Sequence, residues 1–107
     1  MMEIERTVNE FILKCNNCKS GYLHQYQTDV FERSEEEDAG MHTMILHGLT
    51  SVDGNMTGNP SSRRHGLTVR CTCEECDHET ILSIYQHKGA TIMGARSVAE
   101  PMSETSI

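Results

Sequence analysis

Two Cys-X-X-Cys pairs constrain the fold of this chain more than any other feature of its sequence. Two residues between the cysteines of a pair let the backbone curl so that both sulfur atoms reach one metal ion at about 2.3 Å. Two such pairs supply the four thiolates of a tetrahedral site, so the sequence predicts a single metal centre. The predicted ligands are Cys15, Cys18, Cys73 and Cys76.

A metal crosslink would compensate for a small hydrophobic core. The chain has 107 residues, of which 36% are hydrophobic, with two Phe, three Tyr and no Trp. A domain of this size buries only a modest fraction of the surface that its unfolded chain exposes. We therefore expect the metal to be structural and to contribute directly to folding.

Zinc is the expected metal, and iron is the alternative. Zn²⁺ favours four sulfur ligands in a tetrahedron, and four cysteines close the coordination sphere, whereas a catalytic site keeps one position open. Iron also binds four thiolates, but the aromatic-rich surroundings expected around a small electron carrier are missing from both pairs. The sequence contains no nucleophile elbow, phosphate loop or other catalytic signature, so we do not expect an enzyme.

Cysteine usage indicates a cytoplasmic protein. Five cysteines are an odd number for a disulfide framework, and in a reducing compartment such pairs indicate metal binding more often than disulfides. The sequence shows no secretory signal and no apolar run approaching about 18 residues, so we expect no membrane partner. A redox dithiol would need a lowered thiol pKa, and Glu74 and Glu75 inside the second pair would raise it.

Alternating apolar and polar residues predict a mainly β fold. Residues 67–73 show the clearest alternation, and they lead directly into the second cysteine pair. We expect two β-hairpins in an antiparallel sheet around the metal site, the first made by an approach strand ending at Cys15 and a return strand from Tyr22 to about Phe31. Further strands are predicted over 41–47, 80–87 and 90–93, with a turn at Lys88-Gly89.

A helix after the second cysteine pair is the alternative to the strand over 80–87. Helical spacing is also matched by Ile81, Ile84, Tyr85 and Lys88, and Gly89 could end such a helix. The helical version would give a treble-clef-like fold.

One zinc-ribbon-like domain is expected over residues 1–96. Residues 32–40 include four consecutive acidic residues, and residues 50–66 are rich in Gly, Ser and Asn. Both segments are therefore expected to be flexible insertions. The polar segment 97–107, which contains Pro101, is expected to be a disordered tail.

Two further candidate ligands are expected to lie outside the metal shell. Cys71 precedes Cys73 by two residues and shares its side of the predicted strand, so we expect a buried thiol near the site. If Cys71 joined a disulfide, the centre could release its metal, which defines a thiol redox or metal-sensing alternative. His78, two residues after Cys76, is expected beside the shell or in solvent.

The charge balance disfavours nucleic acid as a partner. The formal net charge is −7, and four thiolates around one Zn²⁺ would add roughly −2. Binding to nucleic acid depends on Lys and Arg that neutralise phosphates, so we expect a protein partner, with a homodimer as one form of it. Nucleic-acid or phosphate contact is the alternative, through a local basic cluster of Arg63, Arg64, His65, Arg70 and Lys88.

The two cysteine segments resemble the knuckles of zinc-ribbon proteins. The first, CNNCKSG, spans 15–21, and the second, CEECDHE, spans 73–79. The resemblance implies two β-hairpins around a four-cysteine zinc site, and a role as a protein or nucleic-acid contact in transcription, translation or replication machinery. The chain departs from the family in lacking Pro or Gly inside each pair and in its long insertion between them. In its short length it also resembles small bacterial or phage accessory proteins.

Taken together, these features predict a non-enzymatic protein-interaction module with a structural Zn²⁺ site. A nucleic-acid-binding zinc ribbon in a transcription or replication complex is the second hypothesis.

Overall fold

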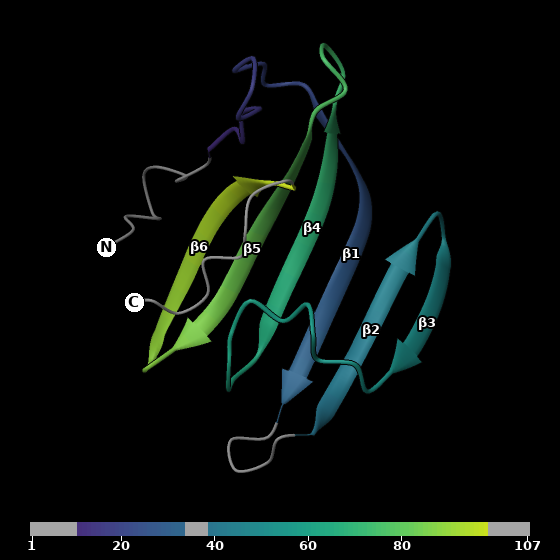
Figure 1. Cartoon of the computed structure of the whole chain (residues 1–107), viewed down its shortest axis with the longest axis vertical. Coiled ribbons are helices and arrows are strands. Elements are labelled where there is room, and N and C mark those ends of the chain that lie inside the picture. The colour runs from purple at the N-terminus through teal and green to yellow at the C-terminus, as the bar shows by residue number, and fades with distance from the viewer. Residues whose placement is uncertain (1–10, 34–38, 99–107) are drawn as a thin grey trace, which may run out of the picture.

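The computed structural model describes residues 11–33 and 39–98, and these form one open antiparallel sheet. Its spatial strand order is β3-β2-β1-β4-β5-β6 (Figure 1). The strands are β1 (Leu23–Arg33), β2 (Gly40–Leu46), β3 (Leu49–Asp53), β4 (Gly66–Cys73), β5 (Glu79–His87) and β6 (Ala90–Ser97). The part of the chain that the structure describes contains no helix, so the predicted mainly β fold is confirmed.

The sheet consists of two three-stranded meanders that meet along β1 and β4. In each meander the second and third strands are joined by a two-residue turn, His47-Gly48 in one and Lys88-Gly89 in the other. All four turn residues have positive φ, with Gly48 at 81° and Gly89 at 84°. Such turns match the right-handed twist of the flanking strands, and glycine adopts their backbone angles at little cost.

Most predicted strands are confirmed, and two expectations are wrong. The residues after the second cysteine pair form β5, so the treble-clef alternative is wrong. The approach strand ending at Cys15 is also wrong, because residues 11–14 pair with no strand and Phe11 is 88% exposed. The predicted first hairpin is therefore replaced by pairing of β1 with β2 and β4.

Strand β3 is a feature that the alternation pattern does not reveal. It lies at the start of the segment 50–66, which was expected to be a flexible insertion. Every residue of β3 is exposed, so the strand is held by its ladder with β2 rather than by a buried apolar side chain. Most of the predicted acidic insertion, 34–38, and most of the predicted tail, 99–107, lie outside the described residues.

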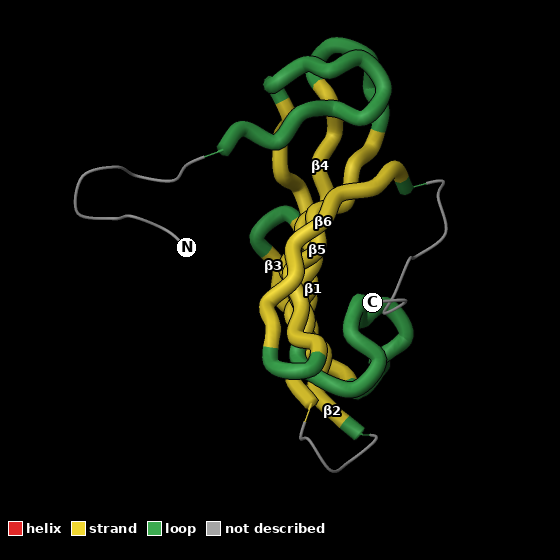
Figure 2. Tube along the Cα trace, turned by 90° about the vertical axis from the view of Figure 1, so that its left-hand side faces the viewer, coloured by secondary structure: helices red, strands yellow, loops and turns green. Residues whose placement is uncertain are grey.

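One face of the sheet, which we call the covered face, carries the core. Phe31, Ile81 and Tyr85 on this face are at most 9% exposed. The loop between β3 and β4 lies against this side only, as the edge-on view in Figure 2 shows. At Gly66 the loop approaches so closely that a Cβ would collide with Asn59 and Pro60, which is why glycine begins β4.

The opposite face is open only over two rows of residues, which we call the uncharged face. Beyond these rows it is covered at the cysteine end, where Cys71, Thr80 and Ser97 are buried, and it carries the exposed Glu32 at the other end. Two adjacent rows of directly paired residues cross all six strands. None of these twelve residues is fully buried, and Met93 and Val52 remain 65% and 59% exposed. The two rows consist of Val52, Thr43, Val30, Leu67, Ile84 and Met93, and of Thr50, Ile45, Thr28, Val69, Leu82 and Ala95.

Candidate metal centre

The central strand pair brings the two cysteine segments to the same end of the sheet. β1 begins and β4 ends at this end, because the two strands are antiparallel and Leu23 pairs with Cys73. The ladder continues one step further, since the backbone N–H of Glu74 donates to the carbonyl oxygen of Tyr22 at 2.9 Å. The first cysteine pair, just before β1, and the second pair, just after β4, therefore lie at the same end of the sheet.

The first knuckle is a tight turn whose amides face a sulfur atom. The backbone N–H of Asn17 donates to Cys15 Sγ at 3.3 Å. The N–H of Lys19 donates to the carbonyl oxygen of Cys15 at 2.9 Å, and the N–H of Cys15 donates to the carbonyl oxygen of Ser20 at 2.8 Å. Lys19 has a φ of 68°, in the left-handed region, which closes the turn.

The second knuckle repeats the first bond for bond. The N–H of Glu75 donates to Cys73 Sγ at 3.4 Å. Asp77 N–H donates to the carbonyl oxygen of Cys73 at 3.1 Å, and Cys73 N–H donates to that of His78 at 2.9 Å. Asp77 has a φ of 62°, at the position equivalent to Lys19. Two segments 58 positions apart therefore present their cysteines in the same local geometry.

The four sulfur atoms form a cluster of the size that one metal ion requires. All four lie within 4.8 Å of one another. Cys15 Sγ is 3.7 Å from Cys76 Sγ, and Cys18 Sγ is 3.6 Å from Cys73 Sγ. A tetrahedron with metal–sulfur bonds of about 2.3 Å has edges of about 3.8 Å. The predicted ligands Cys15, Cys18, Cys73 and Cys76 are therefore brought together and could hold a metal ion, and none of them forms a disulfide.

The pKa values of Cys15 and Cys18 are shifted in opposite directions. Burial raises the pKa of Cys15, but the backbone N–H groups of Cys18 and Asn17 outweigh it and lower this pKa to about 6. For Cys18, the N–H of Ser20 favours the thiolate, yet burial and the neighbouring sulfurs raise its pKa to about 12. Ionisation of Cys15 therefore disfavours ionisation of Cys18, as expected for like charges at this separation. A divalent cation would remove this conflict.

Cys71 and His78 lie close to the cluster and outside it. Cys71 is 3% exposed on the same face of β4 as Cys73, and burial raises the pKa of its thiol. The predicted burial of Cys71 is thereby confirmed. His78 Nε2 lies 2.7 Å from the hydroxyl oxygen of Ser97, on the last residue of β6. His78 thus ties the second knuckle to the edge of the sheet.

A histidine network on the covered face is missed by sequence patterns. His42 in β2 contacts two carboxylates, Asp29 in β1 and Asp53 in β3. The three residues are 13 and 11 positions apart and share no motif. Strand pairing alone places them together, since His42 is directly opposite Asp53.

The predicted basic cluster is formed in part. Arg63, Arg64 and Lys88 line one pocket, at the end of the sheet away from the cysteines. Arg70 is in the middle of β4 and does not line it.

The fold and the site define a mainly β protein with a four-cysteine cluster suited to a metal ion. No protein-family model, no curated protein and no solved structure matches this chain. Within the described residues, no helix has the length and apolar character needed to cross a membrane.

Proposed function

We propose that this chain is a non-enzymatic protein-interaction module, stabilised by one structural Zn²⁺ ion, and that the protein it binds through its sheet is a second copy of itself. The observation that carries the proposal is the uncharged face. The metal centre supports the structural role, because four thiolates fill a tetrahedral shell and leave no position for a substrate or a reactive water.

The chemistry of the uncharged face favours contact with another apolar surface. Three of its twelve residues are threonine and the other nine are apolar. Contiguous exposed apolar patches of this kind are uncommon on monomers and typical of interaction sites. The covered face, by contrast, carries Asp29, Arg70 and Arg96.

The pattern of the two rows argues that a second copy is the occupant. Each chain has a formal net charge of −7, so two copies repel one another over most of their surface. The nearest charged strand residue on this side is Glu32, one row further along β1, so the repulsion is weakest across the uncharged face. Its alternating rows also suit the face-to-face packing of two sheets, about 10 Å apart, in which the side chains of both inner faces interdigitate.

The size of the face suits a weak, reversible dimer. Two rows across six strands spaced by about 4.8 Å, with about four residues of each strand at roughly 3.3 Å per residue, give a face of roughly 29 by 13 Å. Two such faces would bury on the order of 750 Å², which is the size of a weak, transient interface. We therefore expect a dimer with a dissociation constant in the micromolar range.

Sedimentation equilibrium of the zinc-loaded full chain tests this proposal. We expect a dimer at about 100 µM that dissociates on dilution. Ile45→Lys places a charge in one of the two rows and should give a monomer, with zinc content and β-sheet circular dichroism unchanged. Leu49→Lys is the matched control, because Leu49 is 76% exposed and lies on the other side of β3.

Two results would overturn the proposal. The first is a wild-type chain that remains monomeric at about 100 µM. The second is a dimer that survives Ile45→Lys while the zinc content stays at one ion per chain, since the copies would then meet elsewhere.

A further inference from the structure

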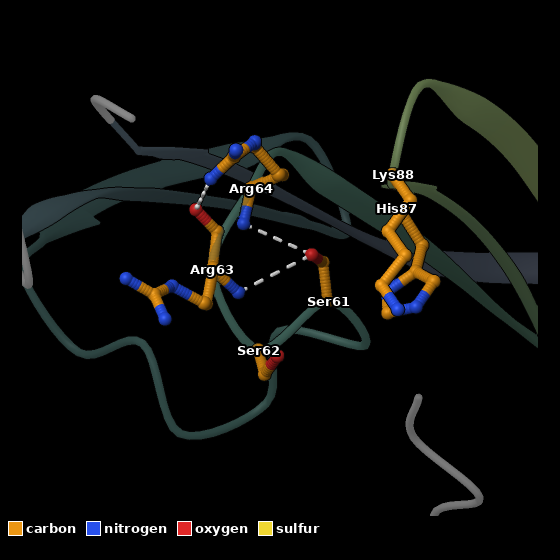
Figure 3. Close-up of a pocket in the computed structure, with 6 residues that line it drawn as sticks. All are labelled: Ser61, Ser62, Arg63, Arg64, His87 and Lys88. Atoms are coloured by element: carbon orange, nitrogen blue, oxygen red, sulfur yellow. Dashed lines mark hydrogen bonds between the residues drawn. The ribbon is translucent and has the colours of Figure 1, made fainter. Parts of the chain in front are cut away.

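A pocket of about 280 Å³ opens at the end of the sheet opposite the cysteines. One wall is the segment 61–64, from the loop before β4, and the other is the end of β5 with its turn into β6. Figure 3 shows Ser61 between the two arginines on one side and His87 and Lys88 on the other, with Ser62 below Arg63. The lining residues are Ser61, Ser62, Arg63, Arg64, His87 and Lys88.

The pocket concentrates positive charge in an acidic protein. Three of the nine Lys and Arg residues of the chain line it, and the lining includes no Asp or Glu. None of the three forms an ion pair with a carboxylate in the described ranges. Because no carboxylate of the described residues neutralises these cations, an anion bound in the pocket would be attracted by all three.

The arginine segment is held in place by its own hydrogen bonds. The Ser61 hydroxyl donates to the carbonyl oxygen of Gln86 at 2.9 Å, which ties the segment to β5. The hydroxyl oxygen of Ser61 also accepts a hydrogen bond from the backbone N–H of Arg64 at 2.9 Å. Asn59 Nδ2 donates to the carbonyl oxygen of Arg64 at 2.9 Å, and an Arg33 guanidinium N–H donates to the carbonyl oxygen of Ser62. The backbone carrying both guanidinium groups is therefore positioned before any ligand arrives.

A second, independent observation comes from His87. Its Nε2 is shielded from solvent and has no hydrogen-bond partner among the described residues, although the side chain lines the pocket. Buried polar atoms without partners are rare, because desolvation without a hydrogen bond is costly. A turn of the imidazole toward an acceptor oxygen bound in the pocket would give this nitrogen the partner that it lacks.

We propose that this pocket binds the phosphoryl group of a small phosphorylated ligand. Arginine forks match phosphoryl oxygens in geometry, and lysine adds a point charge. The pocket is smaller than most drug-sized ligand sites, which suits one phosphoryl group and a small attached moiety. A polynucleotide is disfavoured, because its successive phosphates would meet the remaining surface of a chain whose net charge is −7.

An NMR titration of the zinc-loaded full chain with inorganic phosphate tests the proposal. At constant ionic strength, with chloride as the reference anion, we expect saturable shifts confined to the amides of residues 61–65 and 86–89. The double variant Arg63→Gln, Arg64→Gln should weaken the apparent affinity by about tenfold or more. Lys14→Gln removes the same kind of charge from an exposed position beside the cysteines and should leave the affinity unchanged.

A parallel titration with a single-stranded oligonucleotide separates the two sources of a phosphoryl group. If the oligonucleotide, compared per phosphate group, binds no more tightly than inorganic phosphate, the result supports a small phosphorylated ligand. Binding that is far tighter and falls steeply with salt would overturn that assignment in favour of a nucleic-acid backbone. Shifts spread over the whole surface, or an equal loss of affinity in Lys14→Gln, would overturn the site itself.

Discussion

The imidazole of His42 and the carboxylate of Asp29 form a shielded contact on the covered face, with Nε2 of the ring 2.7 Å from Oδ1 of the acid. The other ring nitrogen, Nδ1, lies 2.9 Å from Oδ1 of Asp53. The ring also stacks on Phe31, with centroids 4.6 Å apart. Burial alone would lower the pKa of His42, but the hydrogen bonds to Asp29 and Asp53 raise it above its usual value. His42 therefore bridges β1, β2 and β3, and the two carboxylates favour its protonated form.

This bridge predicts a pH-dependent contribution to stability. Because the folded-state pKa of His42 is raised, its contribution is complete below the unfolded pKa of about 6.5 and is lost as the pH rises through the folded value. We expect the free energy of unfolding of the wild type to fall, relative to His42→Gln, between neutral and alkaline pH. Urea unfolding of both proteins across this range measures the difference.

Comparison of the wild type with His42→Gln isolates the contribution of His42 to the pH dependence of stability. The cysteines titrate in both proteins, so their contribution cancels in the difference. At pH 6, His42→Gln should be less stable by about 2 kcal/mol, since it loses charge-assisted hydrogen bonds and a stacked ring. Parallel stability curves for the two proteins across the whole range would contradict the assigned role of His42.

Cys73 and its neighbour Cys71 should respond very differently to substitution. Both thiols are buried on the same face of β4, but only Cys73 belongs to the four-sulfur cluster. We expect Cys73→Ser to lose zinc and the folded signal, because structural zinc supplies on the order of 10 kcal/mol of apparent folding free energy. Cys71→Ala should retain one zinc per chain and lose about 1 kcal/mol. Native mass spectrometry and circular dichroism check both variants, and equal zinc loss would contradict the ligand set.

The two left-handed knuckle residues offer a stabilising change. Lys19 and Asp77 both have positive φ, which costs a residue with a Cβ roughly 1–2 kcal/mol. Lys19→Gly and Asp77→Gly should therefore each raise the free energy of unfolding by about 0.5–1 kcal/mol, after the entropic cost of glycine. Asn16→Gly, in the same knuckle without positive φ, is the control and should be destabilising. A loss of stability in all three variants would argue against strain at these turns.

Thr80 presents a buried hydroxyl without a partner among the described residues. Its side chain is fully buried in β5, opposite Cys71. Thr80→Val replaces the hydroxyl with a methyl group of similar size, so we expect stabilisation by about 1 kcal/mol in thermal or urea unfolding. Thr28→Val, at a partly exposed position of the uncharged face, should change stability by less. Destabilisation of Thr80→Val would indicate that the hydroxyl is satisfied.

The parts of the fold that local pattern predicts are those in which neighbouring residues decide the outcome. Alternation over 67–73 gives β4, and the Lys88-Gly89 turn gives the last hairpin, because both depend on a few adjacent residues. The approach strand at Cys15 fails for the opposite reason. Its alternation is present, but a strand needs a neighbour, and the path of the chain supplies none.

By itself, the sequence determined the four candidate ligands and the mainly β class, because the spacing within each Cys-X-X-Cys pair and the period of two along a strand are local properties. Only the three-dimensional arrangement shows that β1 lies against β4, that two uncharged rows of residues stay open on one face, and that His42 meets Asp29. It also assembled the basic pocket from residues 61–64 and the end of β5 with the turn that follows it. These features depend on strand register and on contacts between distant segments, which no local pattern encodes.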